Sequence, residues 1–199
     1  KTRMQPIGNA WAKLPRIVRD LSLKQGKKID LTMQGAETEL DRRILELIKD
    51  PLIHMVRNSA DHGIETPDER RRAGKAETGV VAVQAYHAGG HIMIEIADDG
   101  RGLDMNRIRT KIVDNGWATD SELADMGDKQ IQHYIFKAGF STAETVTGIS
   151  GRGVGMDVVR TNIDKLGGTI EPKSADGRGA TFIIKIPVTL AIVPALVVE

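Results

Sequence analysis

The chain has 199 residues, enough for one domain with a proper hydrophobic core, and its 40% hydrophobic and 28% charged residues are ordinary for a globular protein. A net charge of +1 offers no overall field for nucleic acid or a membrane surface, and the lack of cysteine excludes disulfides and thiolate metal sites. No apolar run approaches the roughly 20 residues that span a bilayer, so we expect a cytoplasmic protein without membrane insertion. The basic cluster at residues 69–75 is interrupted by Glu and Ala, which favours a solvated helix face over a nucleic-acid patch.

The first half of the chain predicts helices and one strand. The predicted segments are helices at 11–21, 38–48 and 50–63 and a strand at 29–33. Gly26 can end the first helix. A separate helix is expected to begin at Asp50 and Pro51, because Asp is a favoured N-cap and Pro a favoured first helical residue. Gly63 can end it in a left-handed conformation.

The second half predicts two hairpins with helices and an irregular stretch between them. The predicted segments are strands at 80–85 and 92–97, a polar helix after residue 102, an irregular stretch at 116–155, a helix at 158–166, and strands at 169–172 and 180–186. Gly-Gly at 89–90 and Asp-Gly at 176–177 are hairpin turn signals. We therefore predict an α+β fold, a two-layer α/β sandwich whose mixed, mostly antiparallel sheet is covered on one face by helices.

The first motif with chemical potential lies on the helix that ends near residue 63. His54, Asn58, Asp61 and His62 share one helix face, opposite an apolar stripe. An Asn oxygen suits Mg²⁺, which prefers oxygen ligands and bridges phosphates. The alternative is a solvated amphipathic helix in which Arg57 pairs with Asp61, and the motif alone does not decide between the two.

The second motif is Asp98-Asp99-Gly100-Arg101-Gly102, at the end of a predicted strand. Glycines two positions apart let the backbone turn sharply and let a ligand approach it. A carboxylate held there can accept a hydrogen bond from an adenine amino group. For the pentapeptide alone, an ordinary Asp-Gly turn is the favoured interpretation.

The third motif is a glycine-rich loop before a helix. Gly151, Gly153 and Gly155 precede that helix, so free N–H groups and the helix dipole converge on an anion, with Arg152 within range of phosphate. The Ser- and Thr-containing residues 140–150 lack a hydrophobic period, which indicates a flap that closes over a nucleotide. A long linker is the alternative.

Together these motifs resemble the N, G1, F and G2 boxes of the GHKL ATPases, the superfamily of gyrases, chaperones and histidine kinases. The segments HMVRNSADHGIE, DDGRGLD, IFKAGFSTAE and SGRGVGMDVV are similar to those of CheA-type chemotaxis histidine kinases in particular. The resemblance covers nearly the whole chain, with Ala138 a departure from the usual Pro. It implies a Bergerat-type fold, with residues 1–8 as a linker from a dimerisation domain, 9–187 as the ATP-binding domain and 188–199 leading to a coupling domain.

The resemblance also implies roles for single residues. Asn58 would hold Mg²⁺ against the triphosphate of ATP, and Asp98 rather than Asp99 would bind the adenine amino group. His54, Asn58 and His62 are the implied catalytic residues. The implied nucleotide contacts are Arg57, Asp61, Asp98, Gly100, Gly102, Arg107, Lys111, Ser141, Thr142, Gly151, Arg152, Gly153 and Gly155.

The implied activity is transfer of the γ-phosphate of ATP to a histidine on a separate phosphoacceptor domain. Hydrolytic members of the superfamily place a Glu where this chain has His54, and a neutral imidazole acceptor needs no carboxylate to activate it. Response regulators, receptor-coupling proteins and dimerisation would involve other domains. The alternatives are an ATPase that drives a conformational clamp and a nucleotide-binding regulatory module without phosphotransfer.

Overall fold

The computed structural model describes residues 3–140 and 155–188. Its elements in chain order are β1 (Met4–Pro6), α1 (Gly8–Trp11), α2 (Leu14–Gln25), β2 (Ile29–Gln34), β3 (Glu39–Asp41), α3 (Arg42–Asn58), the π-helical turn η1 (Ser59–Gly63), α4 (Pro67–Arg72), β4 (Gly79–Ala88), β5 (His91–Asp98), α5 (Met105–Asp114), α6 (Asp120–Ala124), α7 (Asp128–Gln132), the 3₁₀ turn η2 (His133–Phe136), α8 (Met156–Lys165), β6 (Thr169–Ser174) and β7 (Ala180–Pro187). Within the described ranges no helix is both long and apolar enough to cross a membrane.

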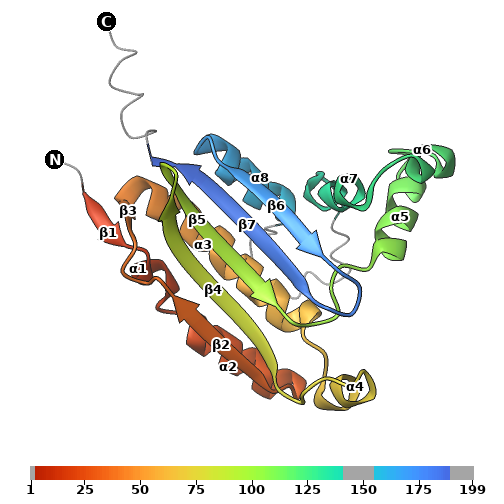
Figure 1. Ribbon diagram of the computed structural model, residues 1–199, viewed down its shortest axis with the longest axis horizontal. Coiled ribbons are helices and arrows are strands. Elements are labelled where there is room, and N and C mark those ends of the chain that lie inside the picture. Colours follow the sequence, from red (N-terminus) through yellow and green to blue (C-terminus); the bar gives the residue numbers. More distant parts are fainter. Residues whose placement is uncertain (1–2, 141–154, 189–199) are drawn as a thin grey trace, which may run out of the picture.

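Five strands form one sheet in the order β2-β4-β5-β7-β6, in which β2 and β4 are parallel and the other neighbours are antiparallel. Helices α2, α3 and α8 lie behind this sheet, whereas α5 to α7 extend beyond its β6 edge (Figure 1). Both predicted hairpins are confirmed, and Gly89 and Gly90 have the positive φ angles of 56° and 76° that a tight hairpin turn requires. The predicted two-layer α+β architecture is therefore confirmed.

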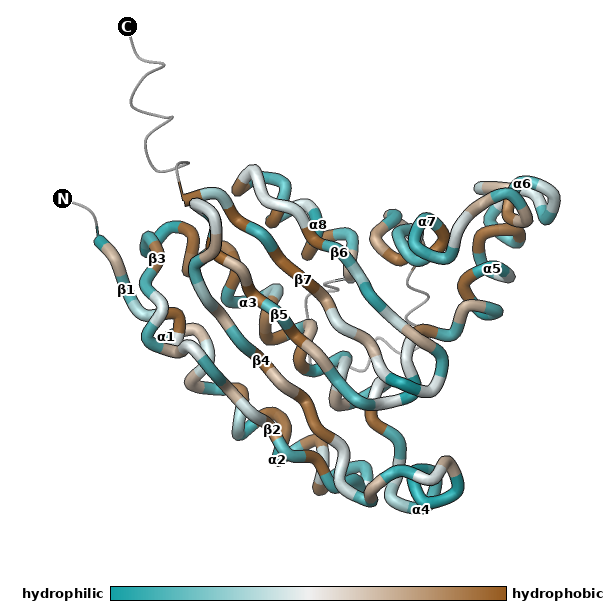
Figure 2. The backbone as a smooth tube through the Cα atoms, in the orientation of Figure 1, coloured by the Kyte–Doolittle hydropathy of each residue, from teal (hydrophilic) through white to brown (hydrophobic). Residues whose placement is uncertain are grey.

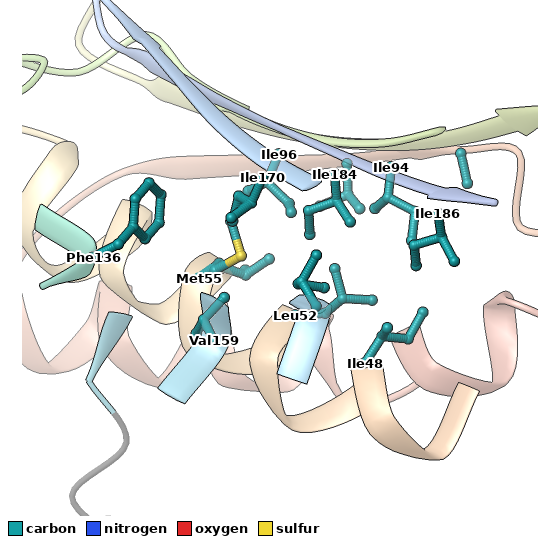
Figure 3. Packing of buried hydrophobic residues seen from close by; sticks show 14 of the residues in the cluster. Ile48, Leu52, Met55, Ile94, Ile96, Phe136, Val159, Ile170, Ile184 and Ile186 are labelled. Atoms are coloured by element: carbon teal, nitrogen blue, oxygen red, sulfur yellow. The ribbon is translucent and has the colours of Figure 1, made fainter. Parts of the chain in front are cut away.

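The core lies between the sheet and the helices. Alternate residues of β5 and β7 face inward, because successive side chains of a strand point to opposite sides. Ile94 and Ile96 of β5 point toward Leu52 and Met55 of α3, with Val159 of α8 beside them (Figure 3). Hydrophobic residues follow the central strands and α3, whereas α4 is hydrophilic (Figure 2). This packing fixes the C-terminal half of α3 under the sheet.

The helix predicted to begin at Asp50 does not exist as a separate element. α3 continues through Pro51, whose ring is buried with the apolar stripe of the helix, so tertiary packing outweighs the local cost of proline. The N-cap is Asp41, whose carboxylate accepts the N–H of Arg43 at 2.8 Å. The predicted left-handed stop at Gly63 is also wrong, because Gly63 is not among the glycines of positive φ.

The turn η1 replaces that stop. The N–H of Ile64 donates to the carbonyl oxygen of Ser59 at 2.9 Å, a bond across five residues instead of four. Ser59 and Ala60 are buried, so η1 continues the packing of α3 up to the loop that follows.

Other boundaries differ from the sequence-based expectations. The segment expected to be a linker, residues 1–8, is in part folded onto the domain, since β1 pairs with β3 and Ile7 is fully buried. The helix expected at 11–21 is divided into α1 and α2, and Gly26 ends α2 with φ 63°, as predicted. The stretch expected to be irregular from 116 onward contains α6, α7 and η2 within its described residues.

Candidate nucleotide-binding site

Three segments that carry the sequence motifs meet at one end of the sheet. The loop after β5 contacts η1, where the N–H of Arg101 donates to the carbonyl oxygen of Gly63 at 2.9 Å. The first residue of α8 reaches the end of α3, where the amide of Asn58 lies 3.9 Å from the sulfur of Met156. The sheet, α3 and α8 therefore bring the second motif beside the first and the last residues of the third.

Asp98 is the last residue of β5, and its carboxylate is largely withdrawn from water. Its Oδ1 accepts the N–H of Gly100 at 3.0 Å. Burial raises the pKa of Asp98 above the ordinary 3.8, although hydrogen bonds from Gly100, Ala180 and Ser59 act in the opposite direction. No cation among the described residues forms an ion pair with this carboxylate, so it has the capacity to accept from a bound amino group.

Glycines surround Asp98 because the backbones there are too close for side chains. A Cβ on Gly100 would lie 1.9 Å from the carbonyl oxygen of Gly63, and one on Gly179 would lie 1.9 Å from that of Asp98. Gly102 has a φ of 77°, and a Cβ there would lie 2.7 Å from the carbonyl oxygen of Ala175. Gly100 and Gly102 are thus required by packing; Gly179 had no signal in the sequence.

His54 and Asn58 are half-buried and lie one turn apart on α3. The Nδ2 of Asn58 lies 3.2 Å from Nε2 of His54 and 3.9 Å from the sulfur of Met156. Burial lowers the pKa of His54, and the charges of Arg57 and His62 lower it further. A neutral imidazole and a thioether both accept hydrogen bonds, so the amino side of Asn58 is held and, among the described residues, no donor engages its Oδ1.

Residues 48–190 match the family described as histidine kinase-, DNA gyrase B- and HSP90-like ATPase. The chain belongs to this ATPase family. It is 54% identical over 198 residues to the sensor histidine kinase CheAY of Helicobacter pylori and 46% identical over 197 residues to the chemotaxis protein CheA of Bacillus subtilis. These alignments cover 100% and 99% of this chain but 25% and 29% of the relatives, so the chain spans about a quarter of their length.

A solved structure of the mycobacterial sensor histidine kinase MprB has the same fold. It is 16% identical, with a TM-score of 0.55, and the match covers 94% of this chain and 97% of that one. The sequence resemblance to CheA-type proteins and the expected GHKL fold are both confirmed.

Membership of the ATPase family implies ATP binding, and the residues present fit an adenine nucleotide. Asp98 offers an acceptor that is largely withdrawn from water, and Gly100, Gly102 and Gly179 let the backbone pack closely around it. The N-cap residue of α8 is Gly155, which offers no side-chain cap, so the first N–H groups of the helix are available to an anion. Gly151, Arg152, Gly153, Ser141 and Thr142 lie outside the described residues.

Four further residues with expected nucleotide contacts have protein or solvent contacts in the structure: Asp61, His62, Arg107 and Lys111. The carboxylate of Asp61 accepts from Gln25 Nε2 at 2.5 Å rather than from Arg57, and His62 is exposed at 3.6 Å from it. Lys111 donates to the carbonyl oxygen of Phe140 at 3.1 Å, and Arg107 is exposed in the first turn of α5. None of these contacts tests the ligand roles expected of the four residues.

The interpretation of residues 69–75 as a solvated face is wrong for part of the cluster. The side chain of Arg70 is 2% exposed and lies against Glu65 and Asp99, and Lys75 joins the same group. Sequence reasoning missed this because the partners are five or more residues apart and meet across loops, where no helical or strand period applies.

Proposed function

We propose that this chain is the catalytic domain of a CheA-like protein histidine kinase, which transfers the γ-phosphate of Mg²⁺-bound ATP to a histidine on a separate phosphoacceptor domain. The observation that carries the proposal is the imidazole of His54, whose Nε2 lies 3.2 Å from Nδ2 of Asn58 and whose pKa is lowered by burial, at the position where hydrolytic members have a carboxylate. High identity to CheA proteins over nearly the whole chain supports it.

Each end of the nucleotide would have its own set of protein groups. Asp98 accepts a hydrogen bond from the adenine amino group, a charge-assisted interaction in a site shielded from water. Gly155 and the N-terminus of α8, with Gly151, Arg152 and Gly153, receive the phosphates. Ser141, Thr142, Arg107 and Lys111 complete the nucleotide contacts.

Asn58 is the proposed metal ligand, through its Oδ1. His54 and Met156 contact the amino group of its amide, so the amide has one orientation and its oxygen is available to a metal ion. When bound, Mg²⁺ supplies positive charge to the phosphate oxygens. Arg57, Asp61 and His62 line the same helix end, and His54 keeps Asn58 in place and orients the phosphate side of the site.

Catalysis of this kind rests on positioning and charge neutralisation rather than on proton abstraction. An acceptor histidine with an ordinary pKa of about 6.5 is largely neutral at pH 7, and neutral imidazole is already nucleophilic. The domain therefore has no need of a strong general base. Residues 9–187 would be the kinase unit and 188–199 the start of a connection to a coupling domain. Response regulators and receptor-coupling proteins would be met through other parts of the full protein.

The decisive experiment incubates the chain with γ-labelled ATP, Mg²⁺ and an isolated phosphoacceptor domain of the CheA type. We expect acid-labile label on the acceptor and none on an acceptor whose histidine is replaced by Gln. Release of labelled phosphate without labelled acceptor would instead indicate an ATPase and would contradict the proposal.

A further inference from the structure

A cluster of four charged side chains lies under the loop that follows Asp98. Glu65 precedes α4, Arg70 belongs to α4, Lys75 follows it, and Asp99 follows Asp98 in the chain. The side chains of Glu65, Arg70 and Lys75 are 9%, 2% and 17% exposed, so charges this hidden need mutual compensation. Two acids and two bases balance formally, yet none of the four has a part in the proposed catalysis.

Arg70 uses its whole guanidinium group to join three segments. Its Nη1 donates to Glu65 Oε1 at 2.9 Å and to the Asp99 carbonyl oxygen at 3.3 Å, and its Nη2 donates to Asp99 Oδ2 at 3.1 Å. Its Nε donates to the carbonyl oxygen of Ala76 at 2.6 Å. The planar fork of arginine suits this arrangement, and a lysine would reach only part of it.

The side chain of Lys75 binds the backbone of the same loop. Its Nζ donates to the carbonyl oxygens of Asp99 and Gly100 at 3.1 and 2.7 Å, and to Glu65 Oε2 at 2.7 Å. Burial disfavours the charged form of Glu65, but the hydrogen bond and charge of Lys75, with that of Arg70, lower its pKa overall. The carboxylate therefore remains a counter-ion for both bases.

The cluster separates the roles of the two neighbouring aspartates. Asp99 directs Oδ1 to the N–H of Val80 at 2.8 Å and Oδ2 to Arg70, so both of its oxygens are engaged by protein groups. Asp98 lies one residue back, and its Oδ1 accepts from the N–H of Gly100, the residue whose carbonyl oxygen Lys75 holds. The position of the Asp98 carboxylate thus depends directly on the residues that Lys75 and Arg70 fix.

We infer that Arg70 and Lys75 are positioning residues of the nucleotide site: they fix the loop 98–100 so that Asp98 faces the adenine amino group, and they thereby set selectivity for adenine. The inference rests on the proposed adenine role of Asp98. Movement of the loop would weaken a hydrogen bond that depends on geometry and would reduce the preference for an amino group over the carbonyl group of guanine.

The test uses Arg70→Lys and Lys75→Met, with Arg71→Met as the matched control. Arg71 lies in the same helix but is exposed and pairs with Asp68 and Glu77 at the surface. Calorimetry with Mg-ATP and Mg-GTP should show that both cluster variants bind ATP with a dissociation constant about tenfold higher than the wild type. This factor is the lower end of the range expected when one charge-assisted hydrogen bond is lost. The ratio of GTP to ATP dissociation constants should fall, and the Arg71→Met values should equal those of the wild type.

The selectivity ratio distinguishes positioning from stability, because a loss of folded protein alone changes the amount of binding and not the ratio. Circular dichroism establishes that each variant is folded. Folded variants with wild-type affinity and wild-type selectivity would overturn the inference, as would failure of both variants to fold. A wild-type chain that binds no ATP would overturn the proposed function itself, which is a distinct result.

Discussion

Asp98 and Asp99 are adjacent in the chain but have different surroundings at the end of β5. Asp99 accepts hydrogen bonds from Arg70 and the backbone of Val80, whereas Asp98 is half-buried without an ion-pair partner among the described residues. A carboxylate that is withdrawn from water without a counter-ion is costly even when it accepts hydrogen bonds, and such groups are concentrated at functional sites. We therefore expect nucleotide binding to depend on Asp98.

Asp98→Asn should sharply weaken ATP binding. A charge-assisted hydrogen bond contributes about 1.5–3 kcal/mol, so the dissociation constant should rise about 10- to 150-fold. Calorimetry with Mg-ATP measures it, and Asp30→Asn, an exposed aspartate of β2, should leave it unchanged. An unchanged constant in Asp98→Asn would place the adenine site elsewhere.

The contribution of Asp98 to ATP affinity should also depend on pH. Because burial raises the pKa of Asp98, its carboxylate takes up a proton at a higher pH than an ordinary aspartate of pKa 3.8. The protonated group loses its charge, so the affinity ratio between wild type and Asp98→Asn should fall toward one as the pH is lowered, and recover as it is raised. Calorimetry on both proteins from about pH 7.5 to about pH 4.5 tests this, and a constant ratio would contradict it.

Asn58→Ala should abolish Mg²⁺-dependent phosphotransfer. The variant lacks the oxygen that His54 and Met156 leave available, so added Mg²⁺ should no longer increase transfer. A Mg²⁺ titration of labelled transfer is the measurement, with Asn106→Ala on the exposed surface of α5 as the control. Wild-type rates in Asn58→Ala would exclude Asn58 as the metal ligand.

Local spacing predicted part of the candidate site. His54 and Asn58 are four residues apart, and helical geometry alone places them on one face. The contact of Asn58 with Met156 joins residues 98 positions apart, which no local pattern reveals. Likewise, the expectation that Asp98 rather than Asp99 binds adenine rests on family resemblance, and the contact of Asp99 with Arg70 that supports it is made only by the fold.

Among the helices and strands, Gly26 shows how a single backbone conformation ends a helix. It has φ 63°, and its N–H donates to the carbonyl oxygen of Ser22. A Cβ at this position would meet nothing within 4 Å, so substitution tests the backbone alone.

Gly26→Ala should lower stability by about 1 kcal/mol, because left-handed backbone disfavours a Cβ. The melting temperature should fall by about 2–4 °C. Gly26→Asn should lower the stability and the melting temperature by less, since asparagine tolerates this conformation. Equal losses in a thermal melt would show that the left-handed conformation is not the cause.

Proline misled the sequence-based prediction of α3. Asp50 and Pro51 have the chemistry of a helix start, and locally that interpretation is favoured. The apolar stripe on both sides of Pro51 keeps one helical phase, and burial against the sheet holds the helix together across it. Long-range packing therefore removed the break that local preference had placed at Asp50 and Pro51.

For the whole molecule, the alternation of the central strands and the turn glycines sufficed to predict the layers and both hairpins. The parallel pairing of β2 with β4 and the small β1–β3 pair were not predicted, because strand order depends on contacts between distant segments. The short helices α6 and α7 carry too few residues for a recognisable period.

Mg-ATP should stabilise the whole domain, since a ligand that binds only the folded state adds to its stability. At about 100 times the dissociation constant the gain is about 2.7 kcal/mol, which raises the melting temperature by about 5–11 °C. Asp98→Asn at the same ATP concentration should lose about half to nine-tenths of the shift, for a dissociation constant about 10- to 150-fold higher, whereas Asp30→Asn should retain it. A ligand-independent melting temperature in the wild type would contradict ATP binding.

The five-residue bond of η1 has a consequence for how the domain tolerates changes in length. An α-helical turn would join Ile64 to Ala60 rather than to Ser59, so η1 holds one residue more than a regular helix. Each residue of a helix adds a rotation of about 100°. Deleting Ser59 or Ala60 would permit an unbroken helix but rotate Gly63 away from Arg101, although every residue with a proposed role in the site is retained. Spacing here is as much a part of the site as residue identity.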